Sequence, residues 1–143
     1  MIGKGGKNIL EKEAMDHVFG YTILNDLGAD TRFIGKNYFT FAPIGPRIIT
    51  KDEISPQNLN LELFVNKVRI ANGNTKDMIF KIPYLISFIS SLLLLEPGDV
   101  IATGTPVDIG PLNPGDIVEA VIEDIGTLTN TVSKVRPKIP KSS

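Results

Sequence analysis

Residues 95–106, which read Leu-Glu-Pro-Gly-Asp-Val-Ile-Ala-Thr-Gly-Thr-Pro, are the stretch around which the rest of the chain is organised. Pro97-Gly98 predicts a type II turn, because proline fixes φ at the first central position and glycine accepts the positive φ of the second. Residues 100–102 then predict a short buried strand. It would end at Gly104 and Thr105, where a ligand can approach the backbone and a hydroxyl can donate or accept a hydrogen bond. Taken alone, the stretch predicts either a ligand-binding strand end or a plain β-turn.

A second strand end with polar residues lies earlier in the chain. Residues 18–24 are mostly β-branched and aromatic, which predicts a buried strand that delivers Asn25 and Asp26 at its end. The two strand ends could therefore face one pocket. Between them, residues 27–46 are punctuated by glycine and proline and predict a long loop of the kind that often carries function.

The remaining pattern predicts an α+β domain that is mainly β. Asn8 is a candidate N-cap, with Glu11 three residues later, for a short helix to about Asp16. Pro83 suits the first turn of a second helix that ends near Leu94. Alternating or β-branched segments predict further strands at residues 47–50, 59–65, 68–71, 117–122 and 126–135, with a turn at 72–73 and a second Pro-Gly turn at 113–116.

Composition excludes several classes of protein. The 143 residues are expected to form a single domain, 1–143, with residues 136–143 as a basic tail. With 15 Lys+Arg against 16 Asp+Glu and no basic cluster, we expect no nucleic-acid partner. The absence of cysteine excludes thiolate zinc sites and cysteine nucleophiles, and favours a cytoplasmic location. The most apolar run, residues 79–95, is interrupted and short for a bilayer, so no membrane partner is expected. His17 is the one histidine and is expected to be structural.

Several separated motifs follow one another along the chain. They lie at residues 20–26 (Gly-Tyr-Thr-Ile-Leu-Asn-Asp), 35–46 (Gly-Lys-Asn-Tyr-Phe-Thr-Phe-Ala-Pro-Ile-Gly-Pro), 74–78 (Asn-Thr-Lys-Asp-Met), 95–106 and 112–130. In their sequence and order they resemble the motifs of the fumarylacetoacetate hydrolase family, and the resemblance extends from Ile2 to about Val135. The resemblance implies a β-roll of mixed sheets with one or two short helices. It also implies a homodimer that uses a divalent metal, Mg or Mn, to hydrolyse, cleave, decarboxylate or isomerise 2-oxo acids or acylpyruvates.

The same resemblance implies roles for individual residues. Asp26 matches the aspartate metal ligand, and Lys36 matches the catalytic lysine that holds the substrate carboxylate or a water. Thr40, Gly104 and Thr105 match positions that bind the substrate. Each has an ordinary alternative: a turn carboxylate at Asp26, a solvated cation at Lys36 and a turn cap at Thr105.

Two departures from the family pattern leave the activity open. The chain begins at Met-Ile-Gly-Lys, so the strand that carries the family's Glu-x-Glu metal ligands has no position upstream, and we expect an amino-terminally truncated fold. The loop after Asp26 is shortened, with Asp30 and Phe33 where the family has arginine and glutamine. One hypothesis is an enzyme acting on a 2-oxo acid. A second is a catalytically incomplete family member that serves as a binding or partner subunit. A small β-barrel interaction module is a third, unrelated interpretation.

Overall fold

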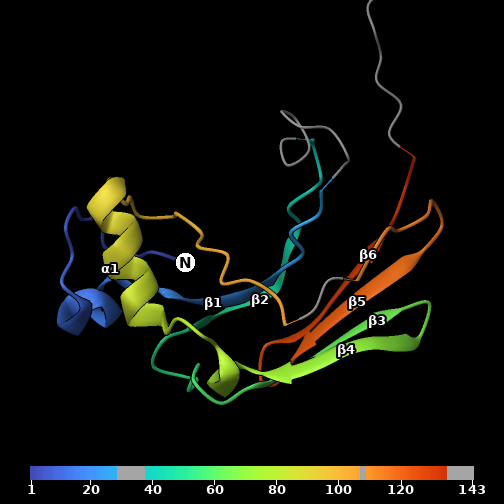
Figure 1. Ribbon diagram of the computed structural model, residues 1–143, viewed down its shortest axis with the longest axis horizontal. Coiled ribbons are helices and arrows are strands. Elements are labelled where there is room, and N and C mark those ends of the chain that lie inside the picture. Colours follow the sequence, from blue (N-terminus) through green and yellow to red (C-terminus); the bar gives the residue numbers. More distant parts are fainter. Residues whose placement is uncertain (29–37, 107–108, 135–143) are drawn as a thin grey trace, which may run out of the picture.

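The computed structural model describes residues 1–28, 38–106 and 109–134, and these residues form a mainly β structure (Figure 1). Along the described chain the elements are the 3₁₀ helix η1 (Glu11–His17), β1 (Gly20–Leu24), β2 (Ile44–Thr50), β3 (Asn60–Val65), β4 (Val68–Asn74), the 3₁₀ turn η2 (Thr75–Asp77), α1 (Ile82–Leu92), β5 (Ile117–Ile122) and β6 (Gly126–Thr131). The mainly β, α+β class predicted from the sequence is confirmed.

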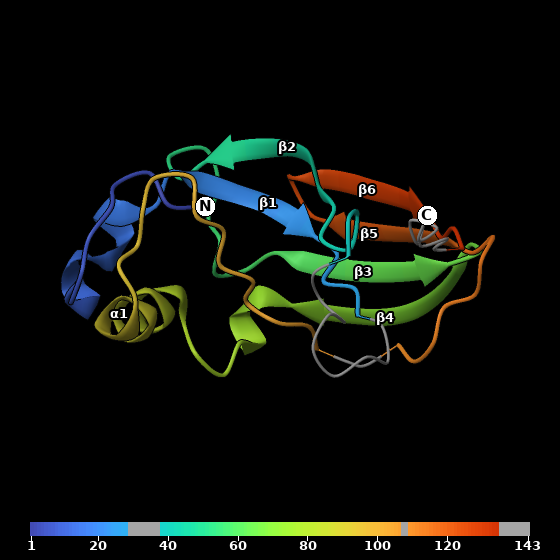
Figure 2. The ribbon, with the colours of Figure 1, turned by 90° about the horizontal axis from the view of Figure 1, so that it is seen from above.

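The strands form two antiparallel sheets. β1 pairs with β2, and the second sheet has the order β4-β3-β5-β6. Figures 1 and 2 show α1 and η1 together at one end of the molecule and the four-stranded sheet at the other, with β1 and β2 between them. β2 also contacts β6, so the small sheet packs onto the larger one.

Alternation along the strands decides which face is buried. Leu61 and Leu63 of β3 lie opposite Ile122 and Ala120 of β5, and Leu128 of β6 lies opposite Ala120. This face packs against β1 in one core cluster, while a second cluster joins α1 and η1 to the amino-terminal segment. Tyr21 packs against both clusters, so β1 connects the two parts of the core.

Helix α1 is confirmed, with Pro83 in its first turn. Ser90 is fully buried on it: its hydroxyl donates to the Ser87 carbonyl (3.0 Å) and accepts from the Ile9 N–H (2.9 Å). This serine therefore fastens the amino-terminal segment to the helix. Among the described residues, none of the helices has the length and apolar character that a bilayer crossing requires.

Two local predictions near the ends of elements are wrong. Asn8 does not cap a helix: it has φ 54°, its N–H donates to the Ser90 carbonyl (2.9 Å), and η1 begins only at Glu11. Attachment to α1 therefore overrides the capping pattern. Residues 72–73 do not turn, because β4 continues to Asn74 and Gly73 pairs with Leu61.

Residues 95–106 follow the prediction only in their first half. Gly98 has φ 98° and the Asp99 N–H donates to the Glu96 carbonyl (3.1 Å), so the turn forms. Residues 100–102, predicted to form a strand, do not form one. The equivalent turn at residues 113–116 does lead into a strand, β5, because β5 lies between β3 and β6. A segment with strand composition becomes a strand only where a neighbour completes its hydrogen bonds.

Candidate functional site

Asp26 lies directly after β1, on a backbone held from both sides. The Asn25 N–H donates to the Pro43 carbonyl (3.1 Å) and the Leu27 N–H donates to the Phe41 carbonyl (3.0 Å). These bonds extend the pairing of β1 with β2 beyond the strands and place the exposed Asp26 beside residues 41–43. Thr40, exposed and with φ 77°, belongs to the adjoining turn. The structure therefore brings together two of the residues that the sequence singled out.

The buried side chain of Asn25, the residue before Asp26, fastens this strand end to the larger sheet. It is buried, and its side-chain amide donates to Oδ1 of Asn130 at 2.9 Å. Asn130 is on β6, two residues after the buried Leu128, so the alternation places it on the inward face. The bond joins the end of β1 to the larger sheet and fixes the backbone that carries Asp26. The sequence analysis missed this pair, although a polar residue at an inward position of a strand was a usable signal.

Gly104 and Thr105 lie on an exposed segment that is anchored at both ends. At one end the Ile2 N–H donates to the Asp99 carbonyl (2.8 Å). At the other, Pro106 packs so closely against Gly73 of β4 that a Cβ added to this glycine would lie 3.2 Å from Pro106 Cγ. Gly104 has φ 92° and open space around it, as its proposed role requires. Figures 1 and 2 show that this segment and β1 both run from the helical end toward the four-stranded sheet and diverge on the way.

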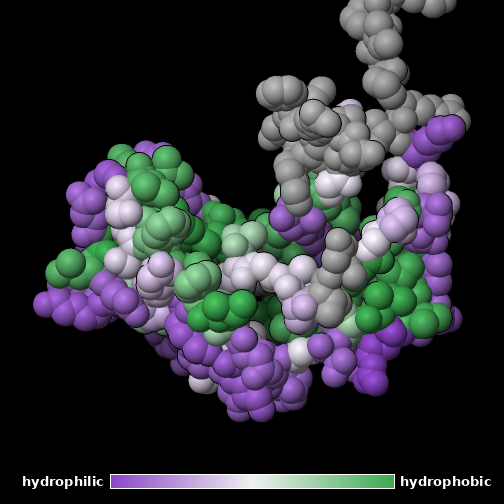
Figure 3. Space-filling model, in the orientation of Figure 1, coloured by the Kyte–Doolittle hydropathy of each residue, from purple (hydrophilic) through white to green (hydrophobic). Residues whose placement is uncertain are grey.

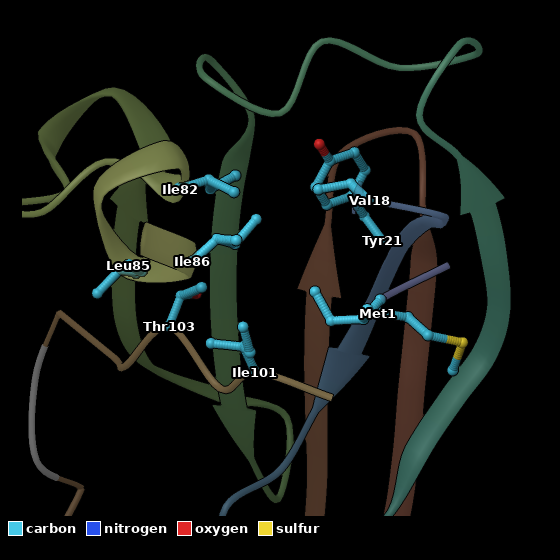
Figure 4. Close-up of a pocket in the computed structure, with 9 residues that line it drawn as sticks. Met1, Val18, Tyr21, Ile82, Leu85, Ile86, Ile101 and Thr103 are labelled. Carbon is cyan, nitrogen blue, oxygen red and sulfur yellow. The ribbon is translucent and has the colours of Figure 1, made fainter. Parts of the chain in front are cut away.

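A small cavity of about 50 Å³ lies between this segment, α1 and β1 (Figure 4). Its lining is almost entirely apolar: Met1, Ile2, Val18, Tyr21, Ile82, Leu85, Ile86, Ile101 and Thr103. The Tyr21 hydroxyl is buried and has no hydrogen-bond partner among the described residues. Burial also raises the pKa of Tyr21 above its usual value. No sequence pattern marked Tyr21 as a candidate functional residue.

We expect Tyr21→Phe to stabilise the protein by about 1 kcal/mol, because it removes a buried donor that lacks a partner among the described residues. The melting temperature should rise by roughly 3 °C. The raised pKa means that the unfolded state ionises first, so the wild-type protein should lose stability as the pH rises past about 10, and the variant should lose less. Thermal and urea unfolding at pH 7 and pH 10.5 measure both effects. Tyr84→Phe, at an exposed tyrosine, is the control. A less stable Tyr21→Phe protein would contradict the assignment.

The Asp26 carboxylate is of the right chemical type for a hard divalent cation, but the described residues do not complete a ligand set. A carboxylate such as that of Asp26 is a preferred ligand for Mg²⁺ or Mn²⁺. Within residues 1–28, 38–106 and 109–134, however, no group of three His, Cys, Asp or Glu side chains could hold a metal ion. Lys36 and the altered loop positions Asp30 and Phe33 lie outside the described residues, as does the basic tail 136–143. The described residues thus show no complete metal site of these four residue types.

Comparison with known proteins identifies the relatives of this chain. A family model described as fumarylacetoacetate (FAA) hydrolase, C-terminal, matches residues 1–133. An uncharacterised protein of Pyrococcus abyssi is 50% identical, with 92% of this chain and 64% of that protein aligned. The mitochondrial oxaloacetate tautomerase fahd2 of Xenopus laevis is 42% identical, with 92% of this chain and 47% of that protein aligned.

Solved structures of the same family also match this chain. Maleylpyruvate hydrolase from Sphingobium sp. SYK-6, crystallised with manganese(II) and pyruvate, matches with a TM-score of 0.88 and 38% identity over 93% of this chain and 51% of the other. The 5-carboxymethyl-2-hydroxymuconate delta-isomerase from Mycobacterium smegmatis matches with a TM-score of 0.88 and 36% identity over 95% of this chain and 56% of the other. The chain therefore spans between about half and two-thirds of the length of these relatives.

Proposed function

The chain belongs to the fumarylacetoacetate hydrolase family, and from this membership we propose that it provides the ligand-binding part of a metal-dependent hydrolase, lyase or isomerase of 2-oxo acids or acylpyruvates. The relatives support the substrate class, because they include a maleylpyruvate hydrolase and an oxaloacetate tautomerase. Maleylpyruvate and oxaloacetate both carry a 2-oxo acid group. A cytoplasmic location and a homodimer belong to the same proposal.

The observation that carries the proposal is the placement of Asp26. It is exposed at a strand end that Asn25 fastens to Asn130, so its carboxylate stands on a rigid support. We assign Asp26 as a metal ligand and Thr40, Gly104 and Thr105 as substrate contacts. Lys36 is assigned to the substrate carboxylate or a water. A divalent cation, Mg or Mn, would act as a Lewis acid on the 2-oxo acid that it chelates.

A second function is favoured by the incomplete ligand set. No group of three His, Cys, Asp or Glu side chains among the described residues could hold a metal ion. In this alternative the chain binds a ligand or a partner chain and has no turnover of its own. The further ligands would come from that partner.

Calorimetric titration with Mn²⁺, with and without oxalate, tests the proposal. Oxalate resembles the enolate of a 2-oxo acid and does not react. We expect oxalate to bind only when Mn²⁺ is present. An assay of oxaloacetate tautomerisation then separates the two functions, because binding with turnover supports the enzyme and binding without turnover supports the partner subunit. A protein that binds neither Mn²⁺ nor oxalate has no site of its own, and the first proposal is then wrong.

A further inference from the structure

Helix α1 carries an apolar stripe on the side that faces away from the core. The stripe consists of Phe80, just before the helix, and Tyr84, Phe88 and Leu92, which recur every four residues and are between 40% and 65% exposed. The buried Ile86 lies two positions from both Tyr84 and Phe88, so it is on the opposite side of the helix. Figure 3 shows apolar residues at the surface of this helical end of the molecule. These four residues are called the α1 stripe below.

The aromatic rings of the α1 stripe are stacked on one another. Phe80 and Tyr84 have ring centroids 5.0 Å apart and planes inclined by 17°, and Tyr84 and Phe88 follow at 6.2 Å and 6°. Rings that already hold one another in place lose less side-chain freedom when a partner covers them. Residues 82–92 contain no charged side chain, so covering this helix removes no ion of its own from water. The α1 stripe therefore has the properties of the core of a protein interface.

The exposed apolar area is large enough for a specific interface. Ile79 and Leu93 extend the α1 stripe at its two ends and are 90% and 63% exposed. Together with the stripe they expose roughly 700 Å², given the area that side chains of this size present. An exposed apolar patch larger than a few hundred Å² is uncommon on a monomer. Two such patches in contact would bury roughly 1,400 Å², which lies within the usual range for stable protein–protein interfaces.

We propose that two copies of this chain pair through the α1 stripe, with the two helices antiparallel. A two-fold pair requires a patch that is complementary to itself. An antiparallel copy, reversed about the level of Ile86, places Tyr84 against Phe88 of the partner copy and Phe80 against its Leu92. Each ring then meets an apolar or aromatic side chain across the interface. The proposal specifies the surface of the homodimer already proposed, and it does not depend on the proposed chemistry.

Charges beyond the two ends of α1 favour the antiparallel orientation. Exposed Lys76 lies ten positions before Ile86, and exposed Glu96 lies ten positions after it. In an antiparallel pair the end of α1 that carries Lys76 lies beside the partner's end that carries Glu96, whereas a parallel pair brings like charges together. Antiparallel helices also place opposite ends of their dipoles side by side. The surface thus matches its own reversed copy, and this match favours a second copy over an unrelated protein as the occupant.

Analytical ultracentrifugation of the wild type and of Phe88→Glu tests the surface. We expect the wild type to form a dimer whose dissociation constant rises at least tenfold in the variant, because the new charge would be buried without a partner at the centre of the interface. Val68→Glu is the control, since it places the same charge on a 62% exposed apolar residue of β4. It should leave the dissociation constant unchanged. A monomeric wild type, or a dimer that Phe88→Glu leaves intact, would overturn the proposal.

Chemical cross-linking tests the orientation and leaves the α1 stripe unchanged. The chain has no cysteine, so Lys81→Cys and Ser91→Cys each introduce a single thiol. Both positions lie five residues from Ile86, so antiparallel helices bring position 81 level with position 91 of the partner copy and hold two copies of position 81 about 15 Å apart. A bis-maleimide too short to span that distance should join the two variants when they are mixed and should join neither variant to itself. Cross-linking of each variant to itself, or no cross-linking in the mixture, would contradict the antiparallel pair.

Titration of Phe88→Glu with Mn²⁺ and oxalate separates this inference from the proposed function. We expect the monomeric variant to bind both within twofold of the wild type, because Phe88 lies on α1 and not among the residues assigned to the site. A wild type that dimerises through α1 but binds neither Mn²⁺ nor oxalate would support the pairing and contradict the proposed chemistry. A wild type that binds both as a monomer would support the chemistry and overturn the pairing.

Discussion

Asp26→Ala is expected to abolish the Mn²⁺-dependent binding of oxalate while leaving the fold intact. The carboxylate is exposed, so its removal creates no cavity in the core. The backbone on either side of this position is held by the N–H groups of Asn25 and Leu27, which donate to the Pro43 and Phe41 carbonyls. The loss should therefore appear in metal affinity and not in the unfolding curve. Loss of a direct ligand should cost on the order of tenfold or more in affinity for the metal.

The control for this variant is Asp52→Ala, which removes the same charge from an exposed turn at the opposite end of β2. Asp26→Asn adds a second test, because it keeps the size of the side chain and removes only the charge. Calorimetry with Mn²⁺ and oxalate, together with urea unfolding, gives both readouts for each protein. If Asp26→Ala binds Mn²⁺ within twofold of the wild type, Asp26 is not a ligand and the proposed site is wrong.

The sequence predicted those strands whose pairing is internal to the described chain. Residues 59–65 alternate and residues 117–122 are mostly β-branched, and each segment pairs with an antiparallel neighbour, so their composition and their environment agree. Residues 100–102 have an equally strand-like composition but do not form a strand. In the described part of the chain no strand pairs with them. Local propensity could not reveal that difference, because it depends on which other segment lies alongside.

At the candidate site, too, local sequence predicted the position of a residue but not the distant contacts that support it. The β-branched and aromatic composition of residues 18–24 predicted that Asp26 follows a strand, and Asp26 does lie just after β1. The residues that make this end rigid, Asn25 and Asn130, are 105 positions apart, so an inward polar position on a strand does not by itself indicate which residue is its partner. The burial of the Tyr21 hydroxyl likewise depends on α1 and residues 101–103, which pack near β1 from far along the chain. Local patterns thus predicted the position of Asp26, whereas the contacts that support this position are tertiary.

Gly20→Ala is expected to be among the most destabilising single changes in the chain. A Cβ at Gly20 would overlap the carbonyl oxygen of Ile49 and would lie 3.0 Å from Ile48 Cγ2, both on β2. The oxygen belongs to the backbone of the paired strand, so β1 and β2 must separate to admit a methyl group. We expect a loss of about 3 kcal/mol or more, as is typical when strain is forced on a packed backbone.

Gly73→Ala is the matched control, because it adds the same methyl group to a strand glycine. There the Cβ would meet Pro106 Cγ at 3.2 Å, a ring on an exposed segment that can move by a few tenths of an ångström. We expect it to cost about 1 kcal/mol or less, the ordinary size of a point-mutation effect. Urea unfolding gives the free energy of unfolding of both variants. Equal losses of this free energy would show that β1 and β2 are not tightly joined at Gly20. Because β1 carries Gly20 at one end and leads to Asp26 at the other, a folded fraction of Gly20→Ala should also bind Mn²⁺ and oxalate more weakly than Gly73→Ala. The pairing of these two strands would then support the chemistry proposed at their end.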